Sequence, residues 1–600
     1  MTEATAPEKC SRPGSGSGHP PRRAWLLPIG LYLLLAGTGL SWGLPNAESW
    51  SNDDIAPSSV LRVDEWYRSG SYKYPYLQLL IDRVLYEPYL RLEAAAGHIQ
   101  AACLPVRRCL EDPPRQLGQL ILISRLRSLF MGLGLLLLTA AVAGAAFGPQ
   151  AAFWAALLAS VNETLGFYAK QGNLDVPYTF WFMASVWVYQ RILRGAGPRH
   201  WLAFGTLAGA ALATKEGIIG AYPLMGLAML INAWRHEAEP AREAGAGAAA
   251  PAAARRLAWS LGLMAFGLLA VYALAMNAVF NPQGLTAHLR HWLQGEGVAP
   301  YNDDYQGALW FASEIGSAAV FGAGWPLFLG LVCGSAFSLA DSATRRPAIA
   351  LSLPLLSYFA FTIVPIRFIF PRFLLPVYLL LACLAAPQLA RLGRVALGKG
   401  PRPRHTRLVA ASLIALLFGY SACYSLNVGL AMRQDSRLQA EAWLAEHLEA
   451  GTQIVGLGSR GALPRLDTLA LEAEWIDWRR LPPYLQAADL KDSERADDEF
   501  QALAQMLSAA DRPSPVAPPG APHWLLLSSR SMPSPAEAGH GLWQGLIAGR
   551  AGYRLRWDSG TDIPVRARYD DRPSPLGAWL PGLVVEARVS PRIWILERRR

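Results

Sequence analysis

Long apolar runs recur through the N-terminal two thirds of the chain, separated by short segments rich in Gly, Pro and charged residues. In a helix, about 20 apolar residues cross the roughly 30 Å hydrocarbon core of a bilayer. Such a run satisfies its backbone polar groups inside a membrane only as a helix. We therefore predict eleven spans, over residues 24–44, 119–147, 151–168, 176–193, 200–214, 216–234, 257–280, 314–339, 348–365, 373–390 and 408–428.

The first run follows a Ser/Gly/Pro-rich segment, residues 1–23, which we expect to be disordered. The run is too long for the apolar core of a signal peptide, and Gly43-Leu44-Pro45-Asn46 is a poor cleavage site. We interpret it as a retained transmembrane helix, the first of a transmembrane domain over residues 24–428.

Two large segments lack spans. Residues 45–118 are rich in Trp, Tyr and Pro and too polar to cross the bilayer, so we expect helices on its surface. In residues 429–600, a helix-like stretch at 437–448 is followed by strand-like runs, which predicts a small α/β domain. The strand-like runs are 453–457, 524–528 and 583–589, and residues 238–254 and 512–522 are expected to be linkers without regular structure.

Composition agrees with a membrane protein, since 52% of residues are hydrophobic and 17% charged, against about 25% charged in soluble chains. The net charge of +10 indicates either a polyanionic partner or a positive-inside bias. The last predicted inside loop, residues 391–407, holds six Lys and Arg and no acidic residue, whereas the short outside loops hold few basic residues. We therefore expect a cytoplasmic N-terminus, a periplasmic or extracellular tail, a location in the inner (plasma) membrane, and no nucleic-acid partner.

Charged residues at the outer mouth of the spans are candidates for chemistry, because charges near a bilayer are costly. The adjacent carboxylates Asp53 and Asp54, just beyond the first helix, can act as a general base or hold a divalent cation. The alternative is a solvated turn or helix cap. Glu163, Lys170 and Asp175 join the third and fourth spans, and Asp175 has the alternative role of stabilising a helix N-terminus.

Three basic residues on the same face suit an anionic ligand. Lys215 interrupts two apolar runs and can bind phosphate or simply pair with Glu216. Arg372 and Arg125 can bind phosphate oxygens in a fork geometry or lie at the membrane interface as snorkelling side chains. Together, carboxylates and cations on one outside face suggest a base that faces a phosphorylated, lipid-linked substrate.

At these residues the chain resembles the GT-C glycosyltransferases, in particular the protein O-mannosyltransferases and the aminoarabinose or RgtA-like lipid-sugar transferases. Five motifs, in family order over about residues 25–390, carry the resemblance. They are an acidic pair followed by Lys73-Tyr74-Pro75-Tyr76-Leu77, then Ser124-Arg-Leu-Arg-Ser128, Tyr168-Ala-Lys170 with Asp175-Val-Pro177, Leu212-Ala-Thr-Lys215-Glu-Gly217, and Pro371-Arg372-Phe-Leu-Leu-Pro376. Trp443-Leu-Ala-Glu-His447 and Trp524-Leu-Leu-Leu-Ser528 of the tail also resemble elements of the outside domain of such enzymes.

The resemblance implies a polytopic all-α membrane protein of GT-C type, with about eleven helices and a C-terminal periplasmic α/β domain. It implies transfer of a sugar, with inversion, from a polyprenyl-phosphate donor to a lipid, glycan or protein acceptor of the cell envelope. Asp53 matches the family's catalytic base, and Asp54 stands where the family usually has Glu. Lys215, Arg372 and Arg125 would neutralise the leaving phosphate, and Asp175 would bind sugar or acceptor, or share a cation with Asp53.

Three questions stay open at this stage. We expect no cofactor and no tightly bound metal, since no further ligands accompany the carboxylates, although a shared divalent cation is an alternative. Cys103 and Cys109 of the first outside segment can form a disulfide or remain two thiols. A multi-pass transporter or lipid-sugar flippase, and a membrane scaffold, are the competing functions. Transporters more often place charges midway along their helices, and a scaffold leaves the charged cluster unexplained.

Overall fold

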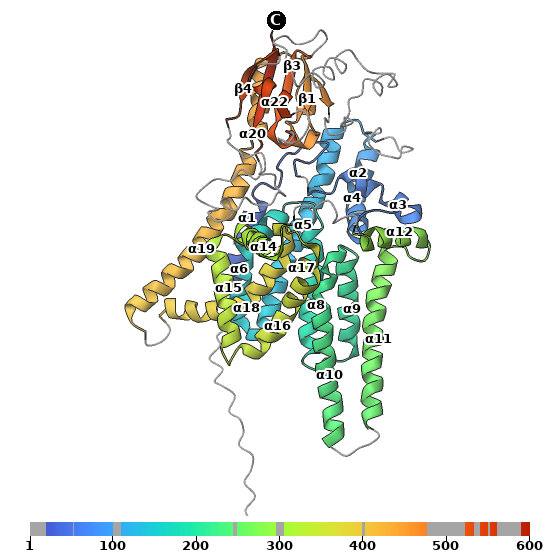
Figure 1. The fold of residues 1–600 in the computed structure, drawn as a ribbon, viewed down its shortest axis with the longest axis vertical. Coiled ribbons are helices and arrows are strands. Elements are labelled where there is room, and N and C mark those ends of the chain that lie inside the picture. The colour runs from blue at the N-terminus through green and yellow to red at the C-terminus, as the bar shows by residue number, and fades with distance from the viewer. Residues whose placement is uncertain are drawn as a thin grey trace, which may run out of the picture.

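In a computed structural model of the 600-residue chain, a bundle of helices lies beneath a small sheet domain (Figure 1). The structure describes residues 20–51, 53–99, 110–243, 249–295, 305–398, 402–476, 522–532, 540–549, 552–560 and 590–599. Cys103, Cys109 and the predicted strand 583–589 lie outside these ranges, so the question of a disulfide stays open.

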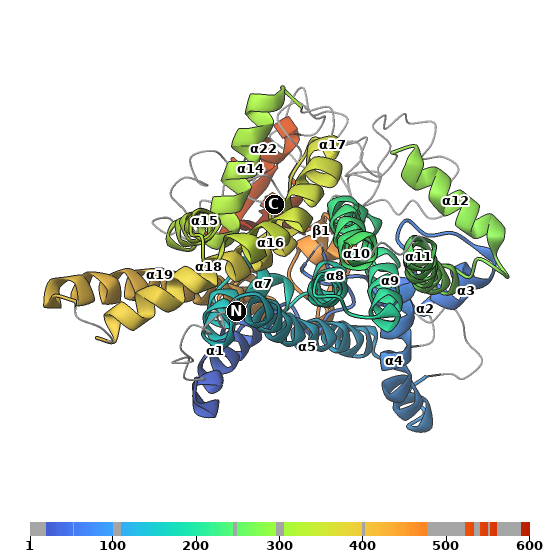
Figure 2. The same cartoon turned by 90° about the horizontal axis from the view of Figure 1, so that it is seen from below.

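The bundle consists of helices that follow the apolar runs. In chain order these are α1 (Leu26–Gly37), α5 (Pro113–Phe147), α6 (Pro149–Ser160), α7 (Glu163–Tyr168), α8 (Asp175–Ile192), α9 (Pro198–Leu212), η3 (Glu216–Ala221), α10 (Pro223–Glu243), α11 (Ala249–Ala275), α14 (Ala308–Ala323), α15 (Trp325–Ala340), α16 (Arg345–Tyr358), η4 (Phe359–Ile363), α17 (Val364–Ile366), η5 (Pro371–Leu374), α18 (Leu375–Ala396) and α19 (Arg404–Arg433). α18 packs against α6, α15, α16 and α19, and the last three lie near it in the view from below (Figure 2). It belongs to the most buried of the candidate spans.

The number of full spans is smaller than predicted. Among the described residues, six helical segments are long and apolar enough to cross a membrane, or seven when α14 and α15, bent by 111°, count as one span. The run 24–44 is helical only as far as Gly37, and the run 151–168 breaks at Val161, after which Asn162 caps α7. The remaining runs are shorter helices inside the bundle. Seven of the eleven predicted runs thus form spans of full length when the bent pair is counted, and the other four are shorter or interrupted helices.

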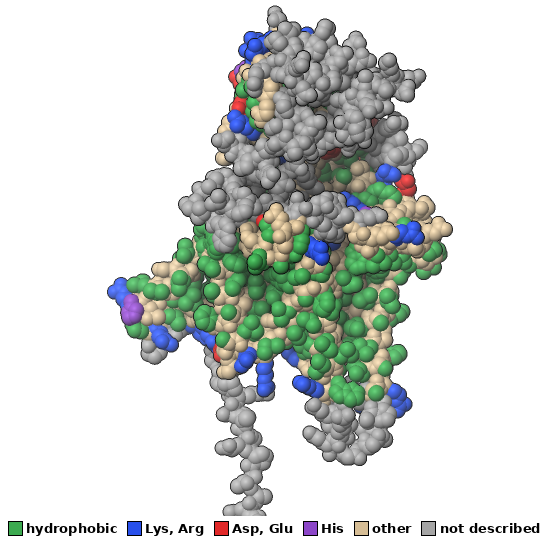
Figure 3. Space-filling view, in the orientation of Figure 1, with side chains coloured by type: hydrophobic (Ala, Val, Ile, Leu, Met, Phe, Trp, Pro, Cys, Tyr) green, Lys and Arg blue, Asp and Glu red, His purple; other side chains and the backbone are tan. Residues whose placement is uncertain are grey.

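The predicted linker 238–254 is also corrected. Residues 238–243 continue α10 and residues 249–254 begin α11, because their alanines favour a helix once its neighbouring turns are formed. On the face shown in Figure 3, apolar side chains cover the bundle, and Lys and Arg side chains gather at the end away from the sheet domain. The chain is thus a multi-pass membrane protein with an asymmetric distribution of charge.

The first outside segment folds into helices at the end of the bundle nearest the sheet domain (Figure 1). These are α2 (Pro57–Leu61), α3 (Val63–Ser69) and α4 (Leu77–Ala95), joined there by α12 (Pro282–Leu293). They share an apolar core with the start of α5, which begins six residues before the predicted span. An ion pair between Asp82 and Arg127, 2.8 Å apart, fixes α4 to α5 in a buried position.

The tail forms the predicted α/β domain, a five-stranded sheet in the order β2-β1-β3-β5-β4. Its strands are β1 (Gln453–Leu457), β2 (Glu472–Ile476), β3 (Trp524–Ser528), β4 (Tyr553–Asp558) and β5 (Ile593–Arg598). β1 lies parallel to β2 and β3, whereas β5 is antiparallel to β3 and β4.

Two helices cover the sheet, α20 (Ser436–His447) on one face and α22 (His540–Ile547) on the other. Leu525 and Leu527 pack toward α22 and Leu526 toward α20, which explains the uninterrupted apolar run of β3. The predicted helix and the predicted strands 453–457 and 524–528 are confirmed.

Candidate active site

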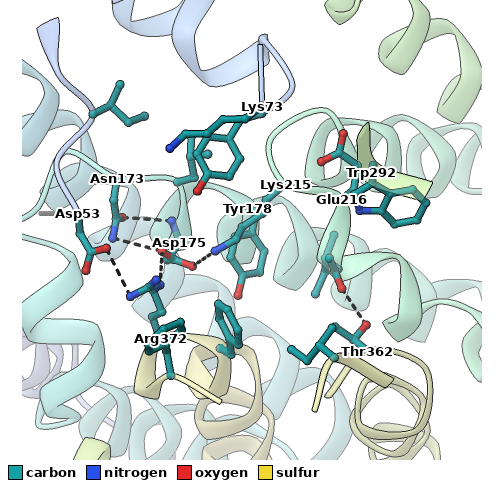
Figure 4. A pocket seen from close by; sticks show the side chains of 18 of the residues that line it. Asp53, Lys73, Asn173, Asp175, Tyr178, Lys215, Glu216, Trp292, Thr362 and Arg372 are labelled. Carbon is teal, nitrogen blue, oxygen red and sulfur yellow. Dashed lines mark hydrogen bonds and ion pairs between the residues drawn. The ribbon is translucent and has the colours of Figure 1, made fainter. Parts of the chain in front are cut away.

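A cavity of about 510 Å³ lies where the segment after α1, the start of α8, the α9–η3 junction and η5 meet. Asp53, Asp175, Lys215 and Arg372 all line it, together with aromatic side chains (Figure 4). The aromatic lining residues are Tyr72, Tyr74, Tyr178, Trp292, Tyr358, Phe368, Phe370 and Phe373. The cavity therefore combines paired charges with rings on which an apolar or sugar surface can pack.

Asp53 belongs to the irregular segment between α1 and α2. Its Oδ1 lies 3.4 Å from Nη1 of Arg372, and only 10% of its side chain is exposed. Arg372 comes from η5, which follows a left-handed residue, Arg367, that ends α17. The guanidinium of Arg372 also lies 4.3 Å from the ring centre of Phe370. This aromatic support limits the positions that Arg372 can take beside the carboxylate.

Asp175 occupies the first turn of α8, as predicted, where the helix dipole stabilises a carboxylate. Its Oδ1 accepts a hydrogen bond of 2.6 Å from Nζ of Lys215, and its Oδ2 lies 3.9 Å from Nε of Arg372. The side chain of Asn173 donates to the same carboxylate at 3.4 Å. Asp53, Arg372, Asp175 and Lys215 thus form one chain of alternating charge, which we call the cavity charge chain.

Lys215 reaches the cavity charge chain because the helix is interrupted at this residue. The residue has an extended backbone between α9 and η3, so its side chain leaves the bundle axis and reaches Asp175. The alternative expected from sequence, a pair between Lys215 and Glu216, is replaced by two separate pairs. Glu216 instead contacts His288 of α12, whose Nδ1 lies 2.8 Å from the carbonyl oxygen of Tyr72.

Asp54 differs from its neighbour. Its carboxylate accepts bonds of 3.0 and 2.7 Å from Nε and Nη2 of Arg125, and one of 2.5 Å from Ser49 Oγ. The backbone N–H of Gly172 donates to the other oxygen, and Gly172 in turn accepts from the backbone N–H of Ile55 at 3.0 Å. Asp54 thereby joins the segment after α1 to the loop before α8, although it also borders the cavity.

Three predicted site residues lie away from the cavity. Arg125 is fully buried in its pair with Asp54. Lys170 is buried and donates to the carbonyl oxygens of Leu35 and Thr38 at 2.9 and 2.8 Å, which satisfies the end of α1. Glu163 is buried in the first turn of α7. None of the three is among the residues that line the cavity, and their part in substrate binding stays a prediction.

The structure adds lining residues that the sequence predictions missed. Lys73 is exposed at the cavity with its Nζ 5.1 Å from the ring centre of Tyr74, and burial raises the pKa of Tyr74 to about 12. The hydroxyl of Tyr74 therefore stays protonated at neutral pH. Both residues stand in the motif that follows the acidic pair, which was the available signal. Tyr178 lay in a predicted span and Trp292 in the polar segment between the spans 257–280 and 314–339, and neither position gave such a signal.

In the described part of the chain, no three His, Cys, Asp or Glu side chains gather closely enough to hold a metal ion. The two carboxylates of the cavity charge chain have a guanidinium between them and an ammonium beside Asp175. The arrangement can bind an anion next to a carboxylate.

Comparison with known proteins adds a family match. Residues 117–259 match the family model of dolichyl-phosphate-mannose-protein mannosyltransferases. This range includes Asp175 and Lys215 of the cavity charge chain. No curated protein sequence matches the chain.

Two solved structures are similar at low identity. ArnT from Cupriavidus metallidurans, bound to undecaprenyl phosphate, is 13% identical with a TM-score of 0.45, covering 85% of this chain and 94% of that one. The oligosaccharyltransferase AglB from Archaeoglobus fulgidus, in complex with an inhibitory peptide and a dolichol-phosphate, is 12% identical with a TM-score of 0.42. That match covers 96% of this chain and 89% of AglB.

Proposed function

We propose that the chain is a membrane glycosyltransferase of the GT-C class that moves a sugar from a polyprenyl phosphate to an acceptor hydroxyl, with Asp53 as the base. The acceptor belongs to the cell envelope and is a lipid, a glycan or a protein. The match of residues 117–259 to the mannosyltransferase family model supports the proposed enzyme class. The proposed roles rest on the position of Asp53, 3.4 Å from Arg372 in the same cavity as Lys215.

The proposed reaction is a single displacement. Asp53 takes the proton of the acceptor hydroxyl, and the acceptor oxygen forms a bond to the anomeric carbon. The bond from that carbon to the phosphate oxygen breaks, and its electron pair leaves with the polyprenyl phosphate. Attack from the face opposite the phosphate inverts the configuration. Phosphate is a good leaving group, so the reaction needs no strong general acid.

Arg372 and Lys215 stabilise the negative charge that grows on the leaving phosphate. In the proposed roles Arg372 presents its fork to the phosphate oxygens, as guanidinium groups favour. Asp175 holds both cations at the cavity and accepts a hydrogen bond from the sugar. A tightly bound metal has no part in this proposal, because a third cation beside Asp175 would be repelled by Lys215 and Arg372.

We place the cavity on the outer side of the inner (plasma) membrane, with the N-terminus in the cytoplasm. Support for this orientation comes from the Lys and Arg side chains that gather at the opposite end of the bundle (Figure 3). The competing transporter function is less well supported, since the paired charges lie at one end of the helices and do not follow a path across them.

The test compares Asp53→Asn with wild type in membranes supplied with radiolabelled undecaprenyl-phosphate sugars. Removal of a general base should reduce transfer by about 10²–10⁴-fold while the protein remains folded. Asp64→Asn is the matched control, because Asp64 is an exposed aspartate of α3 whose partner is Arg83. Transfer at the wild-type rate by Asp53→Asn would contradict the assignment of the base.

A further inference from the structure

The segment between α1 and α2, residues 38–56, carries Asp53 and is held on one side by α5. Arg125 Nη1 donates to the carbonyl oxygens of Leu40 and Trp42, both at 2.8 Å, and its Nη2 donates to Ser49 Oγ at 3.0 Å. Helix and sheet bonds do not satisfy these carbonyl groups, so their positions depend on side chains from elsewhere in the fold.

The C-terminal domain holds the same segment from the other side through Arg437. This arginine, in the first turn of α20, lies with its guanidinium carbon 4.1 Å from the ring centre of Trp50. Asp435 binds it through two contacts, Nε to Oδ1 at 2.9 Å and Nη2 to Oδ2 at 2.8 Å. Asp435 Oδ2 also accepts a bond of 2.9 Å from Trp42 Nε1.

Two further arginines of the domain bind the backbone of the segment. Arg465 Nη1 donates to the carbonyl oxygen of Leu44 at 2.6 Å, and Arg530 donates to that of Trp50. The indole N–H of Trp50 donates at 3.0 Å to the carbonyl oxygen of Leu463. Trp50 and the side chain of Arg437 are both 0% exposed. The domain and the segment are therefore packed as one buried unit.

This contact lies close to the proposed base. Trp50 precedes Asp53 by three residues, and the backbone N–H of Asp53 donates to Ser51 Oγ at 3.2 Å. Gly43 takes a positive φ of 73°, and a Cβ there would approach the ring of Trp50 within 2.7 Å. The segment thus folds back tightly against Trp50, so a shift of this ring also moves the backbone that carries Asp53.

We propose that the C-terminal domain is a positioning element of the active site, with Arg437 acting through Trp50 to set the place of Asp53. The inference rests on the proposed function, because it assigns the domain a part in the same reaction. Arg437 is a positioning residue and does not line the cavity. A misplacement of a reacting group by about 1 Å can reduce a rate by about 10²-fold.

The experiment uses the full chain in detergent or nanodiscs, with Arg437→Ala, Arg437→Lys and Arg592→Ala. Arg592 is the matched control, since it also pairs with an aspartate, Asp558, at 2.6 Å and lies over a tryptophan ring, Trp594, at 5.5 Å. We expect Arg437→Ala to lower kcat by about 10²-fold, with the donor KM within twofold of wild type. Lysine keeps the charge but loses the paired contacts, so Arg437→Lys should restore part of kcat.

A second readout is independent of sugar transfer. Amide hydrogen exchange of residues 42–51 should become faster in Arg437→Ala and remain unchanged in Arg592→Ala. Binding of undecaprenyl phosphate alone, measured by thermal shift, should be equal in all variants. Should Arg437→Ala fail to fold, Trp50→Phe keeps an aromatic ring beside Arg437 but removes the bond to Leu463 and part of the buried ring volume, and it should give a smaller loss of kcat with faster exchange.

The outcomes separate the two hypotheses. Wild-type kcat in Arg437→Ala, or in both Arg437→Lys and Trp50→Phe, overturns the positioning role. An equal loss of kcat in Arg592→Ala also overturns it, because the effect is then a general one on the domain. A wild type that transfers no sugar contradicts the proposed function instead, and the exchange of residues 42–51 still decides whether the domain holds the segment.

Discussion

Asp53 and Asp54 are adjacent in the chain, yet they belong to two different ion networks. Asp53 is part of the cavity charge chain, in which its contact with Arg372 is long, at 3.4 Å. Asp54 belongs to a buried clamp, in which Arg125 makes two contacts of 3.0 Å or less and Ser49 and Gly172 fill the remaining sites. Short, saturated contacts maintain structure, whereas long contacts beside a cavity leave a carboxylate able to exchange partners.

Removal of the arginine of the buried clamp should have the largest effect on stability. Arg125→Met leaves the carboxylate of Asp54 buried without its partner, which costs about 3–5 kcal/mol of folding free energy. We expect a large fall in the unfolding temperature in detergent, measured by scanning fluorimetry. Asp53→Asn is the control and should unfold near the wild-type temperature. Equal stability of the two variants would mean that the networks do not differ.

Removing a cation from the cavity charge chain should give the opposite pattern. Arg372→Ala and Lys215→Ala should each lower the rate of sugar transfer by about 10²–10³-fold, since in the proposed function each stabilises charge on the leaving phosphate. The unfolding temperature should fall less than in Arg125→Met, because Asp175 keeps the other cation of the cavity charge chain beside it when one is removed. The measurement is the initial rate at saturating donor. A stability loss as large as that of Arg125→Met would mean that these residues mainly maintain the fold.

The junction between the networks can be loosened at Gly172. A Cβ there would lie 2.8 Å from Cβ of Ser124 and 3.4 Å from Oδ1 of Asp54, too close for the present packing. Gly172→Ala should cost about 1–3 kcal/mol of stability and reduce transfer together with it. Gly226→Ala in α10 is the control, because nothing lies within 4 Å of its added methyl group. Unchanged stability in Gly172→Ala would show that the two loops move apart without cost.

The smallest effect concerns a peripheral ion pair of the first outside segment. Arg115 donates to both oxygens of Glu93, at 2.9 and 2.8 Å, and these bonds lower the pKa of Glu93 from 4.5 to about 2. A carboxylate with a lowered pKa stabilises the fold at pH values above its ordinary pKa, and this contribution is lost as the pH falls from about 4.5 toward 2. Glu93→Gln should flatten that part of the curve of unfolding temperature against pH. An unchanged acid slope would contradict the assignment.

The fold was predictable where one chemical property dominates. Continuous apolar runs located the helices, and the run at Trp524–Ser528 located a strand buried on both faces. The number of full spans was not predictable from hydropathy, because the breaks at Asn162 and Gly324 depend on which helices pack beside them. Gly324 has a φ of 76° and allows the sharp bend between α14 and α15.

The site was predictable as a set of charges but not as a set of pairs. The sequence predicted four charged residues of the site because charges near a bilayer are costly and therefore indicate function. These are Asp53, Asp175, Lys215 and Arg372. The same argument selected Arg125, which is buried in a clamp, because sequence does not show which carboxylate an arginine meets. Partners far apart in the chain, such as the tail and the segment after α1, become neighbours only through the fold.

The cavity borders helices whose outer faces are apolar. Phe361 and Val364, beside the lining residues Thr362 and Ile366, are 53% and 56% exposed. Under the proposed function, the polyprenyl chain of the donor can remain in the bilayer against this surface while its phosphate enters the cavity. The donor then diffuses in two dimensions. The donor concentration that sets the rate is its mole fraction among the membrane lipids. Dilution with inert lipid should therefore slow transfer, whereas dilution with buffer should not.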